Sequence, residues 1–349
     1  MISPQVDIVI PAYNEAKYIG ECLESLIRQT YTHWRAVVVD NCSNDGTAKI
    51  ADSYAARDER IQVRHCTEFL DQCGNYNRAV AQASHDADYV KVLEADNWLL
   101  DDAIENMVAL GEKDPEIGLI GSYWFRGVRV DGSGLGPERE IIPGREAIRM
   151  FFLNRVYIFG TPSTLLFRAQ ALREEKVWFK PGIFYDDVEL CVRVLSKWKL
   201  GFVHQVLSYV RDDNGGFFSK VRLMDHEPAF RYFLFREHGA SFFDAKTLCP
   251  HLELSRKQYR ERLAYSVFIA RRDSQYLNFH RALFRVNGLV LRRRDLLGPL
   301  LAVLAKPLAI GYRRLSCLIL KKPYREGDEA TYDPPAASRP SADLVRNTA

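Results

Sequence analysis

Short apolar runs alternate with amphipathic stretches from Val6 to Leu93 of this chain. The first run, Val6 to Ile10, is ended by Pro11, and a helical pattern follows from Glu15 to about Gln29, with Asn14 in position to cap it. The order then repeats, with apolar runs at Ala36–Val39, Ile61–Cys66 and Tyr89–Leu93 and helical stretches at 48–57 and 75–83. Such alternation predicts an α/β fold in which helices cover both faces of a mainly parallel sheet.

The pattern changes after the fourth apolar run. A helix is expected at about 102–110, strand-like residues at 118–130, and a turn at Asp131-Gly132. The glycine-rich Gly132–Gly136 resembles a phosphate loop, but Pro137 follows it and no helical pattern does, so we interpret it as a surface hairpin or loop. A further helix is expected over Glu189–Lys199, after the acidic pair Asp186-Asp187.

A chain of 349 residues has room for about two domains. The strand and helix signals predict one domain over 1–220. From there to Arg325 the chain is aromatic, basic and helical in pattern, which predicts a helical region over 221–325. Residues 326–349 are polar and contain three prolines, a composition typical of a disordered tail.

The cysteines and the chain start bear on the expected compartment. The seven cysteines form no CxxC pair, so we expect them to be reduced, as in an intracellular protein. The opening residues MISPQVDIVI lack the basic and apolar regions of a secretory signal. No run of about 18 uncharged apolar residues is present. We therefore expect a cytoplasmic protein without a membrane span.

Charge is distributed unevenly along the chain. The net charge is +3, yet residues 281–325 contain eleven Lys and Arg against one acid, so the rest is negative and nucleic acid is not an expected partner. Residues 292–325 alternate basic clusters with Leu-rich runs, as helices lying on anionic lipid do. The alternative is a subdomain that buries those leucines against the first domain. The first interpretation predicts a protein peripheral to the inner face of the plasma membrane.

Three of the apolar runs end in polar residues. The first leads to PAYNE (Pro11–Glu15), the second to Asp40-Asn41 and the fourth to EADN (Glu94–Asn97). Because the carboxyl ends of parallel strands meet at one edge of a sheet, these residues are expected to share one site. Their aromatic ring and carboxylates suit a nucleotide diphosphate bound with Mg²⁺ or Mn²⁺. The alternatives are that Asp96 and Asn97 cap the helix at 102–110 and that Asp40 begins an Asx-turn.

The acidic pair Asp186-Asp187 is a second candidate centre. A carboxylate there can accept a proton from an attacking hydroxyl group, which is the task of a general base. The alternative is that acidic residues favour a helix N-terminus and that Arg193 is a solvated or paired helix charge. The chain contains no GxxxxGK[ST] loop, HExxH motif or GxSxG motif, and its eight histidines are scattered.

Residues 6–47, VDIVIPAYNEAKYIGECLESLIRQTYTHWRAVVVDNCSNDGT, resemble the opening of inverting family 2 glycosyltransferases with the GT-A fold, of the kind that builds bacterial surface polysaccharides and exopolysaccharides. The resemblance covers about residues 5–220. It continues in order through GNYNRAV (Gly74–Val80), YVKVLEADNWL (Tyr89–Leu99), FGTPSTLLFRAQAL (Phe159–Leu172), the acidic pair and VLSYVR (Val206–Arg211).

The resemblance implies a reaction and its partners. One sugar, of the hexosyl type (EC 2.4), would pass from a nucleotide-diphosphate sugar to an acceptor hydroxyl, with inversion at the anomeric carbon. A UDP-sugar is the favoured donor, a glycan or polyprenyl-linked glycan the acceptor, and Mn²⁺ or Mg²⁺ the cofactor. The QxxRW signature and the multiple spans of processive synthases are absent, which favours addition of a single sugar.

The resemblance also implies roles for individual residues. The nucleotide-sugar would be bordered by residues at the ends of the apolar runs: Pro11, Tyr13, Glu15, Asp40, Glu94 and Asp96. Asp96 matches the last acid of the family's DxD motif and would bind the metal. Asp187 matches the catalytic base. On the acceptor side, contacts or support are expected from Asp186, Arg193 and Trp98.

Three positions depart from the family pattern. Glu94 replaces Asp, Asn97 replaces a frequent Asp, and Asp213 stands where His is frequent. A catalytically degenerate nucleotide-sugar-binding protein of the same fold is therefore the alternative hypothesis. A nucleotidyltransferase would need a basic, glycine-rich loop in place of PAYNE, and a glycosidase would not need the nucleotide edge.

Overall fold

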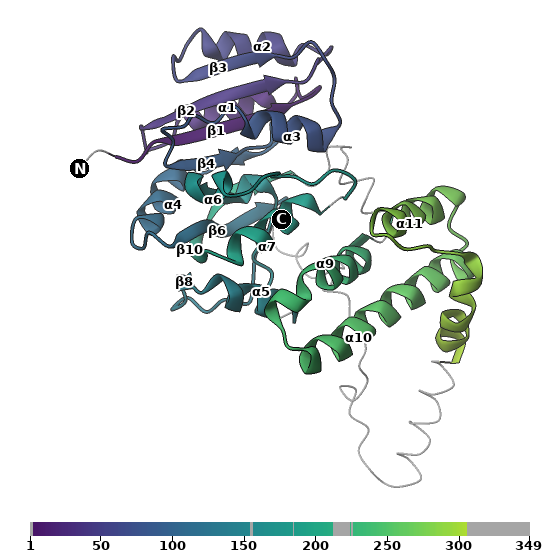
Figure 1. Ribbon diagram of the computed structural model, residues 1–349. Helices are drawn as coiled ribbons and strands as arrows, with labels where there is room; N and C mark the ends of the chain where they lie inside the picture. Colours follow the sequence, from purple (N-terminus) through teal and green to yellow (C-terminus); the bar gives the residue numbers. More distant parts are fainter. Residues whose placement is uncertain (1–2, 154–155, 184, 212–223, 225, 306–349) are drawn as a thin grey trace, which may run out of the picture.

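The computed structural model describes residues 3–153, 156–183, 185–211, 224 and 226–305, and a single mixed sheet lies at its centre (Figure 1). Four of its strands, in the order β3-β2-β1-β4, are parallel. They are β1 (Val6–Ala12), β2 (Trp34–Asp40), β3 (Ile61–His65) and β4 (Tyr89–Val92). Their carboxyl ends consequently point to the same edge of the sheet, as the alternation predicts.

The rest of the sheet is mixed, not parallel. Beyond β4 the order is β9-β6-β10-β5, with β7 beside β6 and β8 beside β10, and in this part only β6 and β10 pair in parallel. These strands are β5 (Trp98–Leu99), β6 (Ile117–Arg126), β7 (Arg129–Asp131), β8 (Ile141–Ile142), β9 (Leu165–Arg168) and β10 (Lys199–Val210). An antiparallel partner needs no crossover helix, so the period of strand and helix that marks the first half is absent here.

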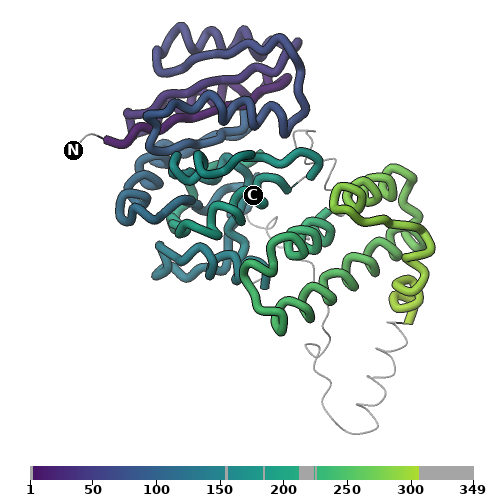
Figure 2. The backbone as a smooth tube through the Cα atoms, in the orientation of Figure 1, coloured from purple at the N-terminus to yellow at the C-terminus, as the bar shows by residue number. Residues whose placement is uncertain are grey.

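Helices cover both faces of this sheet (Figure 2). One buried cluster joins the side chains of Ile8 and Ile10 to α1 (Ile19–Ile27), α2 (Thr47–Ala55) and α4 (Ala103–Gly111). The other joins Val9 and Val39 to α3 (Gln72–Val80), α5 (Gly144–Phe152), α6 (Ala169–Arg173) and α7 (Asp186–Leu195). Successive residues of β1 therefore face opposite layers, which confirms the expected α/β architecture.

Several local expectations are corrected. Asn14 does not cap α1, whose N-cap is Tyr18; it has a φ of 56° and its side chain accepts a hydrogen bond from Asn44 N at 2.9 Å. Helix α7 begins at Asp186, so the acidic pair lies inside its first turn and not before it. The N-cap of α4 is Asp102, which excludes the capping interpretation of Asp96 and Asn97.

The reversal after β6 also differs from the expectation. It lies at Gly127, where φ is +59°, because Arg126 pairs with Arg129. The expected turn at Asp131-Gly132 is instead the end of β7. Gly132 and Gly134 have φ values of 98° and 95° in the segment that follows, so the glycine-rich stretch is a loop, as expected.

The chain turns helical after β10. The helices are α9 (His226–Phe242), α10 (Ala245–Ala264) with a π-helical end (Tyr265–Ile269), α11 (Ser274–Val286) and a 3₁₀ turn (Arg293–Leu296). Phe233, Tyr259 and Phe284 pack together at their centre, with ring centroids 5.3 to 5.9 Å apart. The rings of Phe152 in α5 and Phe235 in α9 are in contact, with their centroids 4.8 Å apart. The helical region therefore continues the core of the sheet region.

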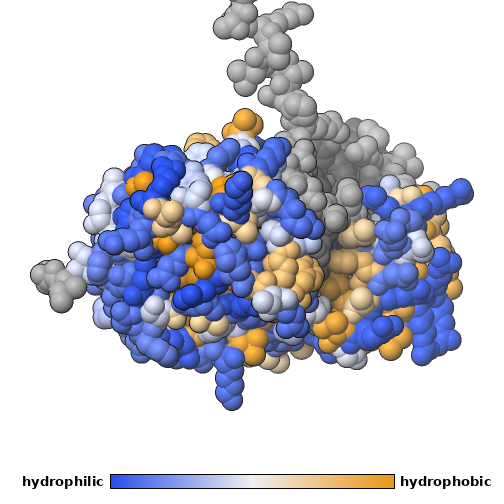
Figure 3. Space-filling model, turned by 90° about the horizontal axis from the view of Figure 1, so that it is seen from above, coloured by the Kyte–Doolittle hydropathy of each residue, from blue (hydrophilic) through white to orange (hydrophobic). Residues whose placement is uncertain are grey.

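The surface and the termini bear on the expected membrane contact. Seen from above, the sheet region is mostly hydrophilic, and hydrophobic residues gather toward the helical region (Figure 3). Among the residues that the structure describes, no helix combines the length and the apolar character needed to cross a bilayer. The expected interfacial segment 292–325 is described only to residue 305, and the expected tail 326–349 lies outside the described residues. Within the described ranges, the cysteines are free.

Candidate active site

The ends of β1, β2 and β4 form the floor of the site. Ala12 pairs with Asp40, and Leu93 N donates to Val9 O at 3.0 Å, so the three chain segments leave the sheet side by side. Pro11 is buried at the end of β1. Asp40 is only 4% exposed, and its Oδ1 atom is buried with no hydrogen-bond partner among the residues that the structure describes. A buried acceptor without a donor is costly, which indicates a binding position for a ligand N–H or O–H group.

Two aromatic side chains flank this floor. Tyr13 is 43% exposed and Phe69 is 55% exposed, and their ring centroids lie 4.9 Å apart. The loop that carries Phe69 is held by Asn41, whose side chain donates to Leu70 O at 2.8 Å and accepts from Leu70 N at 3.0 Å. Phe69 was not among the expected site residues, because no motif surrounds it. Exposed rings beside a buried carboxylate suit a heterocyclic base.

Hydrogen bonds tie the loop after β1 to the loop after β2. Glu15 N donates to Thr47 Oγ1 at 2.7 Å, and Ala16 N donates to Asp45 Oδ2 at 3.0 Å. Asp45 also accepts from Thr47 N at 3.0 Å, which fixes the start of α2. The Asp and Thr of SNDGT thus have a local structural role, because they shape the loop that carries Glu15. Glu15 itself is half-buried beside Asp96.

Glu94 is tied to the protein by both carboxylate oxygens. Oε1 accepts from Tyr76 Oη at 2.9 Å, and Oε2 accepts from Asn97 Nδ2 and Ser163 Oγ, each at 2.9 Å. Asn97 Oδ1 in turn accepts from Arg211 N at 2.9 Å. An aspartate at position 97 has no N–H to donate to Glu94. The two departures from the family's acidic motif therefore form one interaction, in which the amide and the longer acid complement each other.

A buried lysine, Lys91, supports the hydrogen bonds around Glu94. Lys91 of β4 is fully buried, and its Nζ donates to Ser163 O at 2.8 Å and to Leu165 O at 3.0 Å. Burial lowers the pKa of Lys91 to about 7. Lys91 thereby holds the 3₁₀ turn (Pro162–Thr164) whose Ser163 contacts Glu94. The sequence offers no signal for this role beyond a charged residue in an apolar strand.

Negative charge is concentrated around Asp96. Burial, followed by the charges of Asp96, Asp45 and Glu94, raises the pKa of Glu15 to about 7. Arg211 is the cation that opposes this effect; its Nε donates to Asp96 O at 3.0 Å and its guanidinium lies over the Tyr18 ring at 4.2 Å. Asp96 lies among Glu15, Asp45 and Glu94, and this surplus of negative charge fits a divalent cation.

Asp186 and Asp187 lie at the start of α7, near Glu94. Burial is the main cause that raises the pKa of Asp187 to about 8, and the charges of Asp186 and Glu94 add to it. The backbone N–H of Val188 opposes the shift, because it donates a hydrogen bond of 2.7 Å to Asp187 Oδ1. Burial raises the pKa of Asp186 to about 6, and its Oδ1 accepts from Asp187 N at 3.1 Å. Tertiary packing thus brings an acid from the second half of the chain to the strand ends. A buried carboxyl with a pKa near neutrality is typical of a general base.

The two remaining expected residues have structural partners. Arg193 forms ion pairs with Glu175 and Glu189 and donates to Trp178 O at 2.6 Å. Its guanidinium is already bound by these protein groups. The geometry therefore fits the expected supporting role of Arg193 better than a contact with the acceptor. The Trp98 ring is stacked on Tyr209 at 4.9 Å, with 8° between the ring planes.

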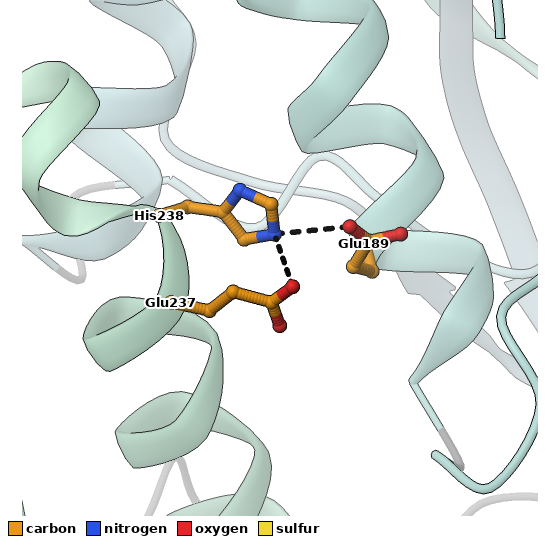
Figure 4. A group of neighbouring side chains, drawn as sticks. All are labelled: Glu189, Glu237 and His238. Carbon is orange, nitrogen blue, oxygen red and sulfur yellow. Dashed lines mark ion pairs between the residues drawn. The ribbon is translucent and has the colours of Figure 1, made fainter. Parts of the chain in front are cut away.

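A second polar cluster lies between α7 and α9 (Figure 4). Glu189 of α7 and Glu237 and His238 of α9 bring their oxygen and nitrogen atoms within 4.8 Å of one another, the spacing of a metal site. However, Lys180 Nζ lies 2.7 Å from Glu189 and 2.8 Å from Glu237, so an ammonium group already occupies the space between the carboxylates. Hydrogen bonds from His238, Lys180 and Arg193 outweigh the effect of burial and lower the pKa of Glu189 to about 2. We interpret the cluster as an ion-pair network that attaches α7 to α9.

Comparisons with known proteins identify the sheet region. Residues 7–175 match the family described as Glycosyl transferase family 2. The glycosyltransferase GlyG of Streptococcus pneumoniae is 28% identical over 124 residues, which are 35% of this chain and 40% of GlyG. EpsE of Bacillus subtilis is 26% identical over 228 residues, 61% of this chain and 75% of its own. The matched segment thus spans only about two fifths of the length of GlyG.

A solved structure has a similar fold. S. aureus TarS 1-349, crystallised in complex with UDP-GlcNAc, is superimposed with a TM-score of 0.58 and 17% identity over 82% of this chain and 84% of that chain. At this identity the likeness concerns the fold alone. It extends over both the sheet region and part of the helical region, and it confirms the expected GT-A architecture.

Proposed function

Because residues 7–175 make this chain a member of glycosyl transferase family 2, we propose that it transfers one sugar from a nucleotide-diphosphate sugar to an acceptor hydroxyl, with inversion at the anomeric carbon. The observation that carries this proposal is Asp187, a half-buried carboxyl with a pKa of about 8 beside the acidic strand ends. The donor that we favour is a UDP-sugar. The complex of the similarly folded TarS with UDP-GlcNAc supports that choice.

Asp187 is the proposed base. Its carboxylate accepts the proton of the acceptor hydroxyl as the hydroxyl oxygen forms a bond to the anomeric carbon. The bond between that carbon and the diphosphate breaks on the opposite face, and the nucleoside diphosphate leaves with the electron pair. A positioned base contributes about 10²- to 10⁴-fold in rate, and it is most effective when its pKa lies near the working pH.

The strand ends form the proposed donor site. Tyr13 and Phe69 would hold the base against their rings, and the Oδ1 of Asp40 would accept a hydrogen bond from the base or ribose. Pro11 and Glu15 border this position. The amide and acid pair of Asn97 and Glu94 would fix the loop that carries Asp96, without contributing a free carboxylate of their own.

Asp96 is the proposed ligand of a divalent cation, Mn²⁺ or Mg²⁺. When bound, such a cation neutralises charge on the diphosphate leaving group. The protein's own contribution is to hold Asp96 in a region of surplus negative charge, beside Glu15 and close to Glu94.

The acceptor is proposed to be a glycan or a polyprenyl-linked glycan in polysaccharide or glycolipid assembly, with Asp186 and Trp98 as acceptor-side residues and Arg193 as support for α7. A lipid-linked acceptor would be reached from the inner face of a membrane. The exposed arginines Arg292, Arg293 and Arg294 support such peripheral contact.

Calorimetry on the purified chain tests the donor site. UDP, GDP, dTDP and CMP are titrated with and without Mn²⁺. We expect UDP to bind with Mn²⁺ and its affinity to fall in Asp96→Ala, while the exposed control Asp101→Asn keeps it. Equal affinity with and without Mn²⁺ would contradict the role of Asp96, and preference for another nucleotide would replace the proposed donor.

Turnover tests the base and separates the catalytically degenerate alternative. Asp187→Asn has nearly the same size as the original residue and no charge, so it should bind UDP as before but lose transfer, or hydrolysis of the UDP-sugar when acceptor is absent, by at least about 100-fold. If the variant retains most of its rate, Asp187 is not the base. If the unchanged chain binds UDP but turns over no sugar nucleotide, the degenerate alternative is favoured.

A further inference from the structure

A basic cavity lies between α10 and the helical segment 297–305. It measures about 260 Å³, and three basic residues of α10 line one side, namely Arg256, Lys257 and Arg260. Gly298, Pro299 and Ala302 line the other side, and their small side chains leave the space open. The acidic residue in the lining is Glu261. None of these residues belongs to the candidate active site.

The cavity has a surplus of positive charge. Arg256 pairs with Glu253 at 2.6 Å, an exposed contact within one helix turn, and Lys257 Nζ lies 3.9 Å from Glu261. Arg260 differs from both: its Nε is buried and has no hydrogen-bond partner among the described residues. The lining therefore has three basic groups against the single acid Glu261, a surplus of positive charge that an anionic group in the cavity would balance.

Exposed leucines adjoin the cavity. Leu297, Leu301 and Leu304 are 52%, 69% and 54% exposed. Their spacing places them on one face of the helical segment. Successive residues of a helix are about 100° apart, so positions 298 and 302, which line the cavity, lie about 60° and 100° around the helix from Leu301. A leucine stripe and an anion-binding cavity are therefore neighbours on one surface, and Arg292, Arg293 and Arg294 extend its positive charge.

We propose that this surface binds anionic membrane lipid, with the headgroup phosphate in the cavity against Arg260, Arg256 and Lys257 and the three leucines in the acyl boundary. A free phosphate or a nucleic acid would satisfy the charges but would leave the leucines in water. A neutral bilayer of phosphatidylcholine would bury the leucines, but the choline cations balance its phosphates, so it would not attract the three basic side chains. An anionic lipid surface satisfies both parts.

The inference extends the proposed membrane partner to residues outside 292–325. It does not depend on sugar transfer. Vesicle binding by a chain without turnover, or turnover without vesicle binding, distinguishes failure of one proposal from failure of the other.

Flotation of the full chain with vesicles tests the inference. We expect binding to vesicles of phosphatidylcholine with phosphatidylglycerol, little binding to phosphatidylcholine alone, and weakening by salt. Since each basic residue near an anionic surface contributes about 1 kcal/mol, the variant Arg256→Gln/Lys257→Gln/Arg260→Gln should lose roughly 100-fold in partition coefficient. Arg256→Lys/Arg260→Lys keeps the charge and should retain most of the binding.

Two further variants separate charge from apolar contact. Lys49→Gln/Arg57→Gln/Arg64→Gln makes the same change in net charge at exposed positions near β3, and it should bind as the unchanged chain does. Leu297→Gln/Leu301→Gln/Leu304→Gln should lose binding while it keeps the cavity. A thermal melt followed by circular dichroism confirms that each variant is folded.

The outcomes decide the inference. Loss of binding in both the cavity variant and the leucine variant, with the charge control unchanged, supports it. It is overturned if the cavity variant binds as well as the unchanged chain, or if vesicles without anionic lipid bind equally. It is also overturned if inorganic phosphate binds the chain in calorimetry while no vesicle does, since the ligand is then a free anion.

Discussion

Replacing Asp186 by asparagine should shift the pH dependence of the proposed reaction without removing it. The charge of Asp186 follows burial as the second cause of the raised pKa of Asp187. Asparagine removes that charge, yet its side-chain oxygen can still accept the hydrogen bond from Asp187 N that is 3.1 Å long in the structure. The geometry at the start of α7 should therefore be retained.

The size of the shift in the pH profile follows from the pKa values of Asp187 and Asp186. A neighbouring like charge is worth on the order of one pKa unit to a buried carboxyl, so the pKa of Asp187 should fall from about 8 to about 7. At pH 7 the fraction of ionised base then rises about fivefold. Below pH 6 the gain disappears, because Asp186, with a pKa of about 6, is itself neutral there. The two profiles should converge on the same plateau only above about pH 9, where the base is mostly ionised in both chains.

The assay is kcat/KM against pH, which reports the ionisation of the free enzyme, at one fixed Mn²⁺ concentration for both chains. Asp101→Asn, an exposed substitution with the same change of charge, should leave the profile in place. An unmoved profile in Asp186→Asn would mean that the rate does not follow the ionisation of Asp187. A rate that falls at every pH would mean that Asp186 contacts the acceptor directly.

Three further substitutions test the buried polar groups. Glu189→Gln removes a buried acid that pairs with both Lys180 and Arg193, and it should lower the free energy of unfolding by about 3–5 kcal/mol in urea melts near pH 7. Because the pKa of Glu189 is about 2 in the fold against 4.5 ordinarily, that difference should shrink as the pH falls from about 4.5 toward 2. Lys91→Met should cost about 1–3 kcal/mol near pH 7, since two carbonyl groups lose their donor. Burial lowers the pKa of Lys91 from 10.5 to about 7, so the unchanged chain should gain stability relative to this variant between pH 7 and 10.5, and parallel curves would refute the assignment. Asn97→Asp places a second carboxylate 2.9 Å from Glu94 and should lower the melting temperature, whereas an unchanged value would show that the amide is not needed as a donor.

Local patterns were most informative in the first part of the chain. The apolar runs of β1, β2, β3 and β4 were located to within about two residues, because a buried strand between turns has a short, recognisable pattern. The mixed second half of the sheet was not foreseen in detail. Strands such as β5 and β8 have two residues each, which is too short for any period to be visible.

Candidate residues fared differently according to what their role depends on. The strand-end acids could be predicted, since the carboxyl edge of a parallel sheet is where ligands bind. That Glu94 is held by Tyr76, Asn97 and Ser163 could not, because these donors come from α3, from the same loop and from a segment almost 70 residues away. Phe69 and Lys91 belong to no motif and acquire their positions from packing alone.

The sequence by itself determined the order of strands and helices, the strand-end residues and the acidic pair of α7, since all of these follow from hydrophobic periodicity and short motifs. The tertiary structure decided which of those residues meet. It placed Asp187 near Glu94, left both acids of the pair only partly exposed, and formed a basic cavity beside exposed leucines. The physical reason is that burial and electrostatic coupling depend on every neighbour within a few ångströms, and those neighbours come from segments that are distant in the chain.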